Sequence, residues 1–424
     1  MKIQIITLLF LLASNAAMAQ TVSIEECFAK ARENYPLIRQ KSLIEQANAI
    51  EIDNVSKSLL PQASINAQAT LQSDVVSIPI QLPAGADIPK ISKDQYKAYI
   101  DVVQTIWDGG YSRAMKEILA QSGKVEAQTV EVEMFSLREQ VTNLYLGVLM
   151  LEEQMKMTGL MRENLETNLK VAEILHNNGV ATEADLDMLK VEILNTLQKS
   201  AEARTTQAGC LAMLSALVGL NISVDAMQKP SADISINRNE NDNPLALRPE
   251  NALFEQQNAL IESREKLIKA KNMPRFNLFA QGGYGKPGLN MLANRFELFG
   301  IGGVRLSWNF GNLYTRSNER RMLDTDREKL RNRQETLIFN VNRQLLQIEK
   351  ELQTFEELLK RDDEIIELRK TLRQASEKKY NNGVLTVNDL VKDLNAENIA
   401  RQNKIMHQIQ YIINVYKHKN LLNY

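Results

Sequence analysis

The sequence has little of what most enzyme and metal sites are built from, since its 424 residues include only 2 cysteines and 3 histidines. Cys27 and Cys210 lie far apart and have no metal-ligand spacing, so we expect small buried residues, with a disulfide left open. His176, His407 and His418 form no ligand cluster, and no nucleophile–base pair can be proposed. We therefore expect no enzyme, no catalytic residues, no cofactor and no bound metal.

Long apolar runs are also missing beyond the N-terminus. Lys2 is followed by an apolar run from Ile3 to Ala13 and then by Ala17-Met18-Ala19, which predicts a signal peptide over residues 1–19. The alternative, a membrane anchor, would need a longer run. No later stretch approaches 18 apolar residues, so we expect no membrane-spanning helix. The net charge of −1 argues against a nucleic-acid partner.

Proline and glycine are absent over long distances. Residues 312–382 contain neither, and at about 1.5 Å per residue a helix over this range would span roughly 105 Å. Residues 111–176 predict a second helix of about 100 Å, with Gly123, Gly147 and Gly159 as weak points. Leucine, valine and isoleucine residues in both ranges recur at steps of three and four, which predicts coiled-coil packing against return helices near 183–220 and 387–422.

A twelve-residue motif occurs twice, 204 residues apart, over residues 176–187 and 380–391, and the two copies are identical at seven positions. Each copy follows a long helical pattern and precedes another helix. A pair of prolines 25 residues apart also recurs, as Pro36 with Pro61 and as Pro249 with Pro274. The chain is therefore a tandem duplication whose repeated unit is a long helical hairpin.

After the second proline of each pair, the hydrophobic period changes to two. Alternation over 63–80, 96–107, 276–284 and 296–308 predicts two strands per repeat, each with one apolar face and one more polar face. Trp107 and Trp308 end the second strand of each repeat and match the aromatics that mark a lipid interface. The alternative is that both indoles only pack under the strand-to-helix turns.

Four strands cannot stand in lipid alone, because both sheet edges would leave unpaired N–H and C=O groups. Several copies can close one barrel. Two copies would give eight strands and a lumen filled by side chains, whereas three would give twelve strands and room for a passage. We therefore predict a homotrimer.

The order of these features resembles the TolC-type outer-membrane efflux protein family over about residues 20–424. The resemblance is carried by Leu60-Pro61, Met273-Pro274, the strand end Trp107-Asp108-Gly109-Gly110, and the turns that end in Asp185-Leu186 and Asp389-Leu390. It implies a mainly α fold with membrane β structure: a trimeric 12-stranded barrel, four strands per chain, continued by a long α-helical coiled-coil tunnel through the periplasm. It also implies a passive exit duct in the cell outer membrane, in contact with outer-membrane lipid, a periplasmic adaptor (membrane fusion) protein and an inner-membrane pump.

The expected organisation is a signal peptide followed by two equivalent halves. The segments are 1–19 signal peptide, 20–60 N-terminal periplasmic helices, 61–108 first β-hairpin of the barrel, 109–220 first long helical hairpin, 221–248 linker or equatorial belt, 249–273 helix, 274–310 second β-hairpin of the barrel, and 311–424 second long helical hairpin.

The resemblance places the periplasmic entrance of the duct at the two turns. It implies gate roles for Asp185 and Asp389, and a latch role for Tyr380. The usual arginine partner of that latch falls at Leu385, and a further acidic position falls at Lys392. A ring of carboxylates around a narrow axis would attract cations. Each aspartate also completes a T-x-x-D capping box, so a helix cap and a gate stay open as roles.

The exposed tips of the turns, Gly179-Val180 and Gly383-Val384, are the expected adaptor-docking residues. Glycine at such a tip is also explained by the positive φ of a tight turn alone. A glycine-rich stretch over residues 283–288 matches G-x-G-x-x-G, but it starts inside a strand and opens no helix, so it fails as a dinucleotide motif. The rival function is a periplasmic coiled-coil adaptor or scaffold. The sequence does not identify the cargo.

Overall fold

The computed structural model describes residues 21–76, 91–230 and 245–423. The predicted signal peptide, most of the loop between the first two strands and part of the predicted linker lie outside the described residues. The chain divides into two compact units. The hairpin unit comprises Met1–Gln40, Thr129–Asn251 and Glu335–Tyr424, and the sheet unit comprises Lys41–Gln128 and Ala252–Gln334.

Each unit takes elements from both halves of the sequence. The sheet unit holds the four strands and the helical segments next to them: most of α3(Ile38–Lys57), β1(Gln62–Leu71), β2(Asp94–Trp107), most of α4(Tyr111–Phe135), most of α7(Pro249–Lys271), β3(Arg275–Lys286), β4(Glu297–Ser307) and the first part of α8(Asn312–Asn381). The hairpin unit holds α2(Ile24–Asn34), α5(Leu137–Asn177), α6(Glu183–Val218), the short 3₁₀ helix η2(Val224–Ala226), the rest of α8 and α9(Val387–Leu422).

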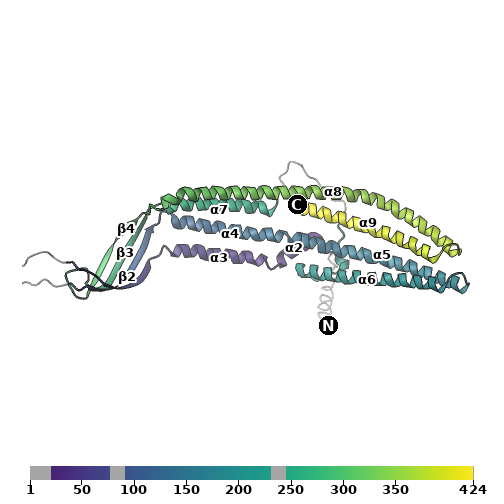
Figure 1. Ribbon diagram of the computed structural model, residues 1–424, viewed down its shortest axis with the longest axis horizontal. Coiled ribbons are helices and arrows are strands. Elements are labelled where there is room, and N and C mark those ends of the chain that lie inside the picture. Colours follow the sequence, from purple (N-terminus) through teal and green to yellow (C-terminus); the bar gives the residue numbers. More distant parts are fainter. Residues whose placement is uncertain (1–20, 77–90, 231–244, 424) are drawn as a thin grey trace, which may run out of the picture. The chain divides into compact units, whose positions relative to one another are not determined.

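The four strands form one antiparallel sheet in the order β1-β2-β3-β4 (Figure 1). The central pairing of β2 with β3 joins the first repeat to the second, so the duplicated sequence makes a single sheet. Within the described residues, β1 and β4 have a strand neighbour on one side only. Their outer edges therefore present backbone N–H and C=O groups that no described strand pairs.

Glycine in the long helices serves close packing in one clear case. Asn48 of α3 donates a side-chain hydrogen bond to the carbonyl of Leu119 in α4. A β-carbon added at Gly123 would lie 2.7 Å from the Asn48 side chain, so only glycine admits this contact. Gly123, Gly147 and Gly159 all lie inside helices. The helices therefore continue through all three predicted weak points.

The first long helix is interrupted at Ser136 instead, so that the structure has α4 and α5 where the sequence predicted one helix. The Ser136 hydroxyl donates to the Glu133 carbonyl at 2.8 Å. The backbone bond from Gln140 to the Ser136 carbonyl is stretched to 3.5 Å. A serine that bonds back to the preceding turn competes with the helix ladder and bends it, which accounts for the break.

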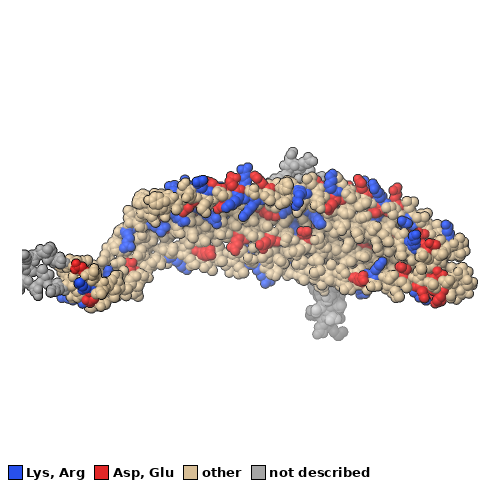
Figure 2. All heavy atoms as spheres, viewed as in Figure 1, with Lys and Arg blue, Asp and Glu red and all other residues tan. Residues whose placement is uncertain are grey.

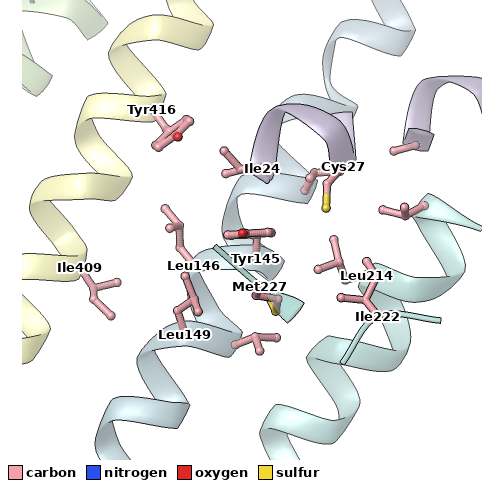
Figure 3. Close-up of a cluster of buried hydrophobic side chains, with 14 residues drawn as sticks. Ile24, Cys27, Tyr145, Leu146, Leu149, Leu214, Ile222, Met227, Ile409 and Tyr416 are labelled. Atoms are coloured by element: carbon pink, nitrogen blue, oxygen red, sulfur yellow. The ribbon is translucent and has the colours of Figure 1, made fainter. Parts of the chain in front are cut away.

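The core of the hairpin unit lies where four helices meet. Side chains from α2, α5, α6 and α9 converge around Tyr145 (Figure 3). The Tyr145 hydroxyl is itself bonded, since it donates toward the carbonyl oxygens of Val22 and Gln228 at 2.7 and 2.6 Å. Most positions of the predicted coiled-coil seams are buried: Leu137, Val141, Val148, Leu151, Leu345, Ile348 and Leu352. The other seam positions, Leu144, Phe355 and Leu359, are half-buried.

The seam between α8 and α9 is more polar than the seam between α5 and α6. Arg373 of α8 contacts Glu397 of α9 at 2.5 Å, and Arg401 binds the same carboxylate at 2.6 Å. Farther along, His407 Nδ1 lies 2.7 Å from the buried carboxylate of Asp362. Paired charges of this kind fix the register of two helices more than they stabilise them.

Candidate functional site

The two interhelical turns have the same backbone structure. Gly179 and Gly383 both have φ of +72°, the left-handed conformation that glycine adopts without strain. The N–H of Val180 reaches back to the carbonyl of Leu175 at 2.8 Å, and the N–H of Val384 makes the equivalent bond at 2.9 Å. This six-to-one bond is the Schellman pattern that ends a helix at a glycine.

Both aspartates of the turns are the third residue of a helix that has a threonine N-cap. Asp185 takes part in a reciprocal capping box: its carboxylate accepts from the backbone N–H of Thr182 at 2.9 Å and from its hydroxyl at 2.7 Å. Asp389 accepts from the hydroxyl of Thr386 at 2.7 Å. Of the two turns, only the one that precedes α6 has a reciprocal capping box. The two predicted gate residues thus share a cap position but differ in how many bonds engage the carboxylate.

The tips of the two hairpins touch. A β-carbon added at Gly383 would lie 3.2 Å from Cγ1 of Val180, whereas one added at Gly179 would have no neighbour within 4 Å. Val180 and Val384 are 57% and 75% exposed. The predicted docking residues therefore form one shared, solvent-exposed end of the hairpin unit.

Tyr380 lies beneath this end and is only 3% exposed. Its hydroxyl has no hydrogen-bond partner within the described part of the chain. Burial raises the pKa of Tyr380 above its ordinary value, and the negative charge of Asp185 raises it further. The ring packs in an apolar cluster contributed by both hairpins: Met161, Leu165, Ala172, Leu186, Leu189, Val387, Leu390, Val391 and Leu394.

The positions where the sequence departs from the family pattern have different environments. Leu385 packs against the apolar cluster around Tyr380, so an aliphatic side chain is accommodated where an arginine was expected. Lys392 is exposed.

The sheet carries a continuous exposed apolar face. The register places Ile65, Ile100, Gly282 and Gly300 in one cross-strand row, and alternate residues of each strand follow on that face. Large apolar side chains on it are strongly exposed: Ile65, Leu71, Ile100, Leu278, Tyr284, Leu298, Val304 and Leu306. On the face shown in Figure 2, charged side chains gather over the helices and at the strand tips, and few lie over the strands.

Trp107 reaches the apolar face because of a β-bulge. Thr105 pairs with Asn277, but Trp107 pairs with Phe276, so one extra residue intervenes at Ile106. A bulge of this kind turns the following side chain to the opposite face. The indole of Trp107 therefore lies 5.7 Å from the Phe276 ring, centroid to centroid.

Trp308 lies just beyond the last residue of β4. Its indole N–H donates to the carbonyl of Asn272 at 3.1 Å, and its ring lies 4.7 Å from that of Phe310. Half of the residue stays exposed. The ring is thus tied at its polar end while its apolar surface faces outward, the arrangement of a tryptophan at a lipid headgroup layer.

The described residues contain neither a metal-binding cluster nor a membrane-spanning helix. No group of three or more histidine, cysteine, aspartate or glutamate side chains there is placed to hold a metal ion. None of the helices in that part of the chain is both long and apolar enough to cross a membrane.

Comparisons with known proteins agree with this geometry. The outer membrane efflux protein family model matches residues 28–220. The fold is similar to that of the outer-membrane channel OprN, at 15% identity over 94% of this chain and 89% of that one, with a TM-score of 0.66. It is also similar to VceC of Vibrio cholerae, at 13% identity over 94% of this chain and 95% of that one, with a TM-score of 0.63. The open MtrE channel of Neisseria gonorrhoeae is similar at 14% identity over 94% of this chain and 88% of that one, with a TM-score of 0.66. A search of curated proteins found no match.

Proposed function

We propose that this chain, which matches the outer membrane efflux protein family model over residues 28–220, is a passive exit duct in the cell outer membrane, joined to a periplasmic adaptor and an inner-membrane pump. The observation that carries the proposal is the exposed apolar face of the sheet. A soluble protein rarely exposes a patch of this kind, whereas the outer wall of a membrane barrel requires one.

The open edges of the sheet support an assembly of several copies. In lipid, the free N–H and C=O groups of β1 and β4 would cost several kcal/mol each, at an order-of-magnitude level, so each edge must find a partner. Pairing β4 of one copy with β1 of the next satisfies both edges. Three copies close a twelve-stranded barrel wide enough for a passage.

The shared end of the two hairpins is the proposed periplasmic entrance. Three copies would bring Asp185 and Asp389 into rings of carboxylates, which attract cations and repel one another at a narrow axis. Both carboxylates would keep their bonds to the N-cap threonines. The exposed valines, Val180 and Val384, are the proposed contacts for the adaptor, since they offer the protruding apolar surface of this end.

The function is tested by reconstitution. Purified protein should sediment with the outer-membrane fraction, migrate as a heat-sensitive oligomer and conduct ions across a planar bilayer. A water-soluble monomer without ion current would favour the rival, a periplasmic adaptor or scaffold. Cross-linking from position 180 or 384 to a co-expressed adaptor tests the docking residues; no product at either position would exclude them.

A further inference from the structure

The polar face of the sheet carries an organised cluster of aromatic rings and cations. Tyr99 and Phe299 lie in one cross-strand row with Gly283 between them. A β-carbon at Gly283 would lie 2.8 Å from Cζ of Phe299 and 2.4 Å from Cβ of Tyr99, so the glycine leaves the space that the Phe299 ring occupies. The glycine-rich stretch that fails as a dinucleotide motif thus makes room for aromatic rings.

A cation lies over these rings. The Nζ atom of Lys97 is 4.7 Å from the ring centroid of Tyr99 and also 4.7 Å from that of Phe299. Both distances fall within the range of cation–π attraction. No carboxylate of the described residues forms an ion pair with Lys97. Glu297, in the same row, is held by Arg295 at 2.6 Å. Asp101 is four residues farther along the strand, which separates its Cα from that of Lys97 by about 13 Å.

The same construction recurs farther along this face. Phe279 lies over Gly303, where an added β-carbon would be 3.1 Å from the ring. The guanidinium of Arg305 lies 4.6 Å from the centroid of that ring. We call these five side chains, Lys97, Tyr99, Phe279, Phe299 and Arg305, the aromatic–cation face.

A cavity of about 270 Å³ adjoins Lys97 and Phe299. Its other walls are mostly apolar, from Val76, Ile91, Leu289 and Met291, with the amides of Gln72 and Gln95 as neutral polar groups. Among the described residues, the lining contains no acidic side chain. An apolar cavity with one cation and hydrogen-bonding amides suits a small organic anion that has an aromatic or aliphatic body. It does not suit a metal cation.

We propose that the aromatic–cation face is a transit site, inside the barrel, for organic anions with an apolar body. The proposal rests on the proposed function, which makes the polar face of the sheet the wall of the lumen. Lys97 attracts the anionic group while the rings of Tyr99 and Phe299 contact the body. Because the rings of Phe299 and Phe279 occupy space left by Gly283 and Gly303, the site binds from the wall without closing the passage.

The test is block of the ion current by naphthalene-2-sulfonate in planar bilayers. Wild-type protein should be blocked, and Lys97→Met should weaken the block about tenfold, because the charged group that binds the sulfonate is removed. The control is Lys286→Met, which removes a cation at the same height on the opposite face. It should leave the block unchanged. 2-Naphthol should block both variants equally, and a naphthyl ammonium probe should block neither more strongly than 2-naphthol does.

Equal block of wild type and Lys97→Met by the sulfonate would overturn the proposal, and so would preferential block by the ammonium probe. If no channel forms, the proposed function itself fails. The site is then tested separately by isothermal titration of the detergent-solubilised protein with the sulfonate. Binding that Lys97→Met weakens supports the site, and binding that Lys97→Met leaves unchanged rejects it.

Discussion

Gly383 lies directly against Val180, so that the backbone of one hairpin tip contacts a side chain of the other. The equivalent residue, Gly179, has the same φ of +72° but open space around it. The duplicated turn has thus diverged in its surroundings while its backbone stayed the same.

Because only Gly383 has a close neighbour, substitutions at the two glycines distinguish the effect of backbone strain from the effect of packing. Gly179→Ala and Gly383→Ala should each lower the free energy of unfolding by about 1–2 kcal/mol, because an L side chain is strained at this φ. Gly383→Ala should lose more, since Val180 must also move by a few tenths of an ångström. Chemical unfolding followed by circular dichroism measures both. Equal losses would mean that the tip contact contributes nothing.

The two aspartates should respond differently to loss of charge. Asp185→Asn disturbs a carboxylate that accepts two bonds from Thr182, and we expect it to lose about 1 kcal/mol of stability. Asp389→Asn disturbs a single hydroxyl contact and should be nearly neutral in stability, yet raise the ion conductance if its ring gates the entrance. Unchanged conductance with lowered stability would leave Asp389 as a cap alone.

Tyr380 combines a buried ring with a hydroxyl that has no partner among the described residues. Tyr380→Phe should therefore be neutral or slightly stabilising, because it removes a buried polar group that no bond compensates. Tyr380→Ala should lose about 3–5 kcal/mol through the cavity it leaves. A loss above about 1 kcal/mol in Tyr380→Phe would contradict this environment and require a partner for the hydroxyl beyond the described residues.

Alkaline pH should loosen the hairpin unit through Cys27. Burial, and then the charges of Glu26 and Glu25, raise the pKa of this thiol from 9.0 to about 11. Because the folded pKa is the higher one, the stabilisation is complete below pH 9 and is lost as the pH rises toward 11. Burial also raises the pKa of Tyr145 in the same core.

The measurement is the free energy of unfolding across this pH range. Cys27→Ala should make the loss of stability with pH shallower, because one ionising group is removed, while Tyr145 keeps part of the slope. Cys210→Ala is the control, since that side chain is only partly buried. An identical slope in wild type and Cys27→Ala would reject the role of the thiol.

Much of this fold could be predicted because its signals are local and repeated. The turns at Gly179 and Gly383, the alternating strands and the helical seams all follow from periodicity and from the placement of glycine and proline. β1 is shorter than predicted, since it ends at Leu71 rather than near residue 80. Alternation marks where a strand can form, but the partner strand decides where it ends.

Features set by contacts between distant residues could not be predicted. The bulge before Trp107 depends on the register of β2 against β3, which lie in different halves of the sequence. The break at Ser136 depends on one hydroxyl that bonds backward rather than on a glycine. The burial of Tyr380 depends on the meeting of the two hairpins. The sequence identified Tyr380 as a candidate residue of the entrance, but the spacing of residues along a chain does not show how deeply a side chain is buried.

The proposed pairing of β1 with β4 between copies is tested most directly by disulfide cross-linking. Ser64→Cys in β1 is combined in turn with Ile301→Cys and with Arg305→Cys in β4, all on the polar face of the sheet. The control partner, Val304→Cys, points to the apolar face and should not cross-link. We predict that at least one polar-face pair yields a closed covalent ring of three copies in membranes. Cross-links within single chains only, or a monomer in every case, would contradict the barrel and the duct it encloses.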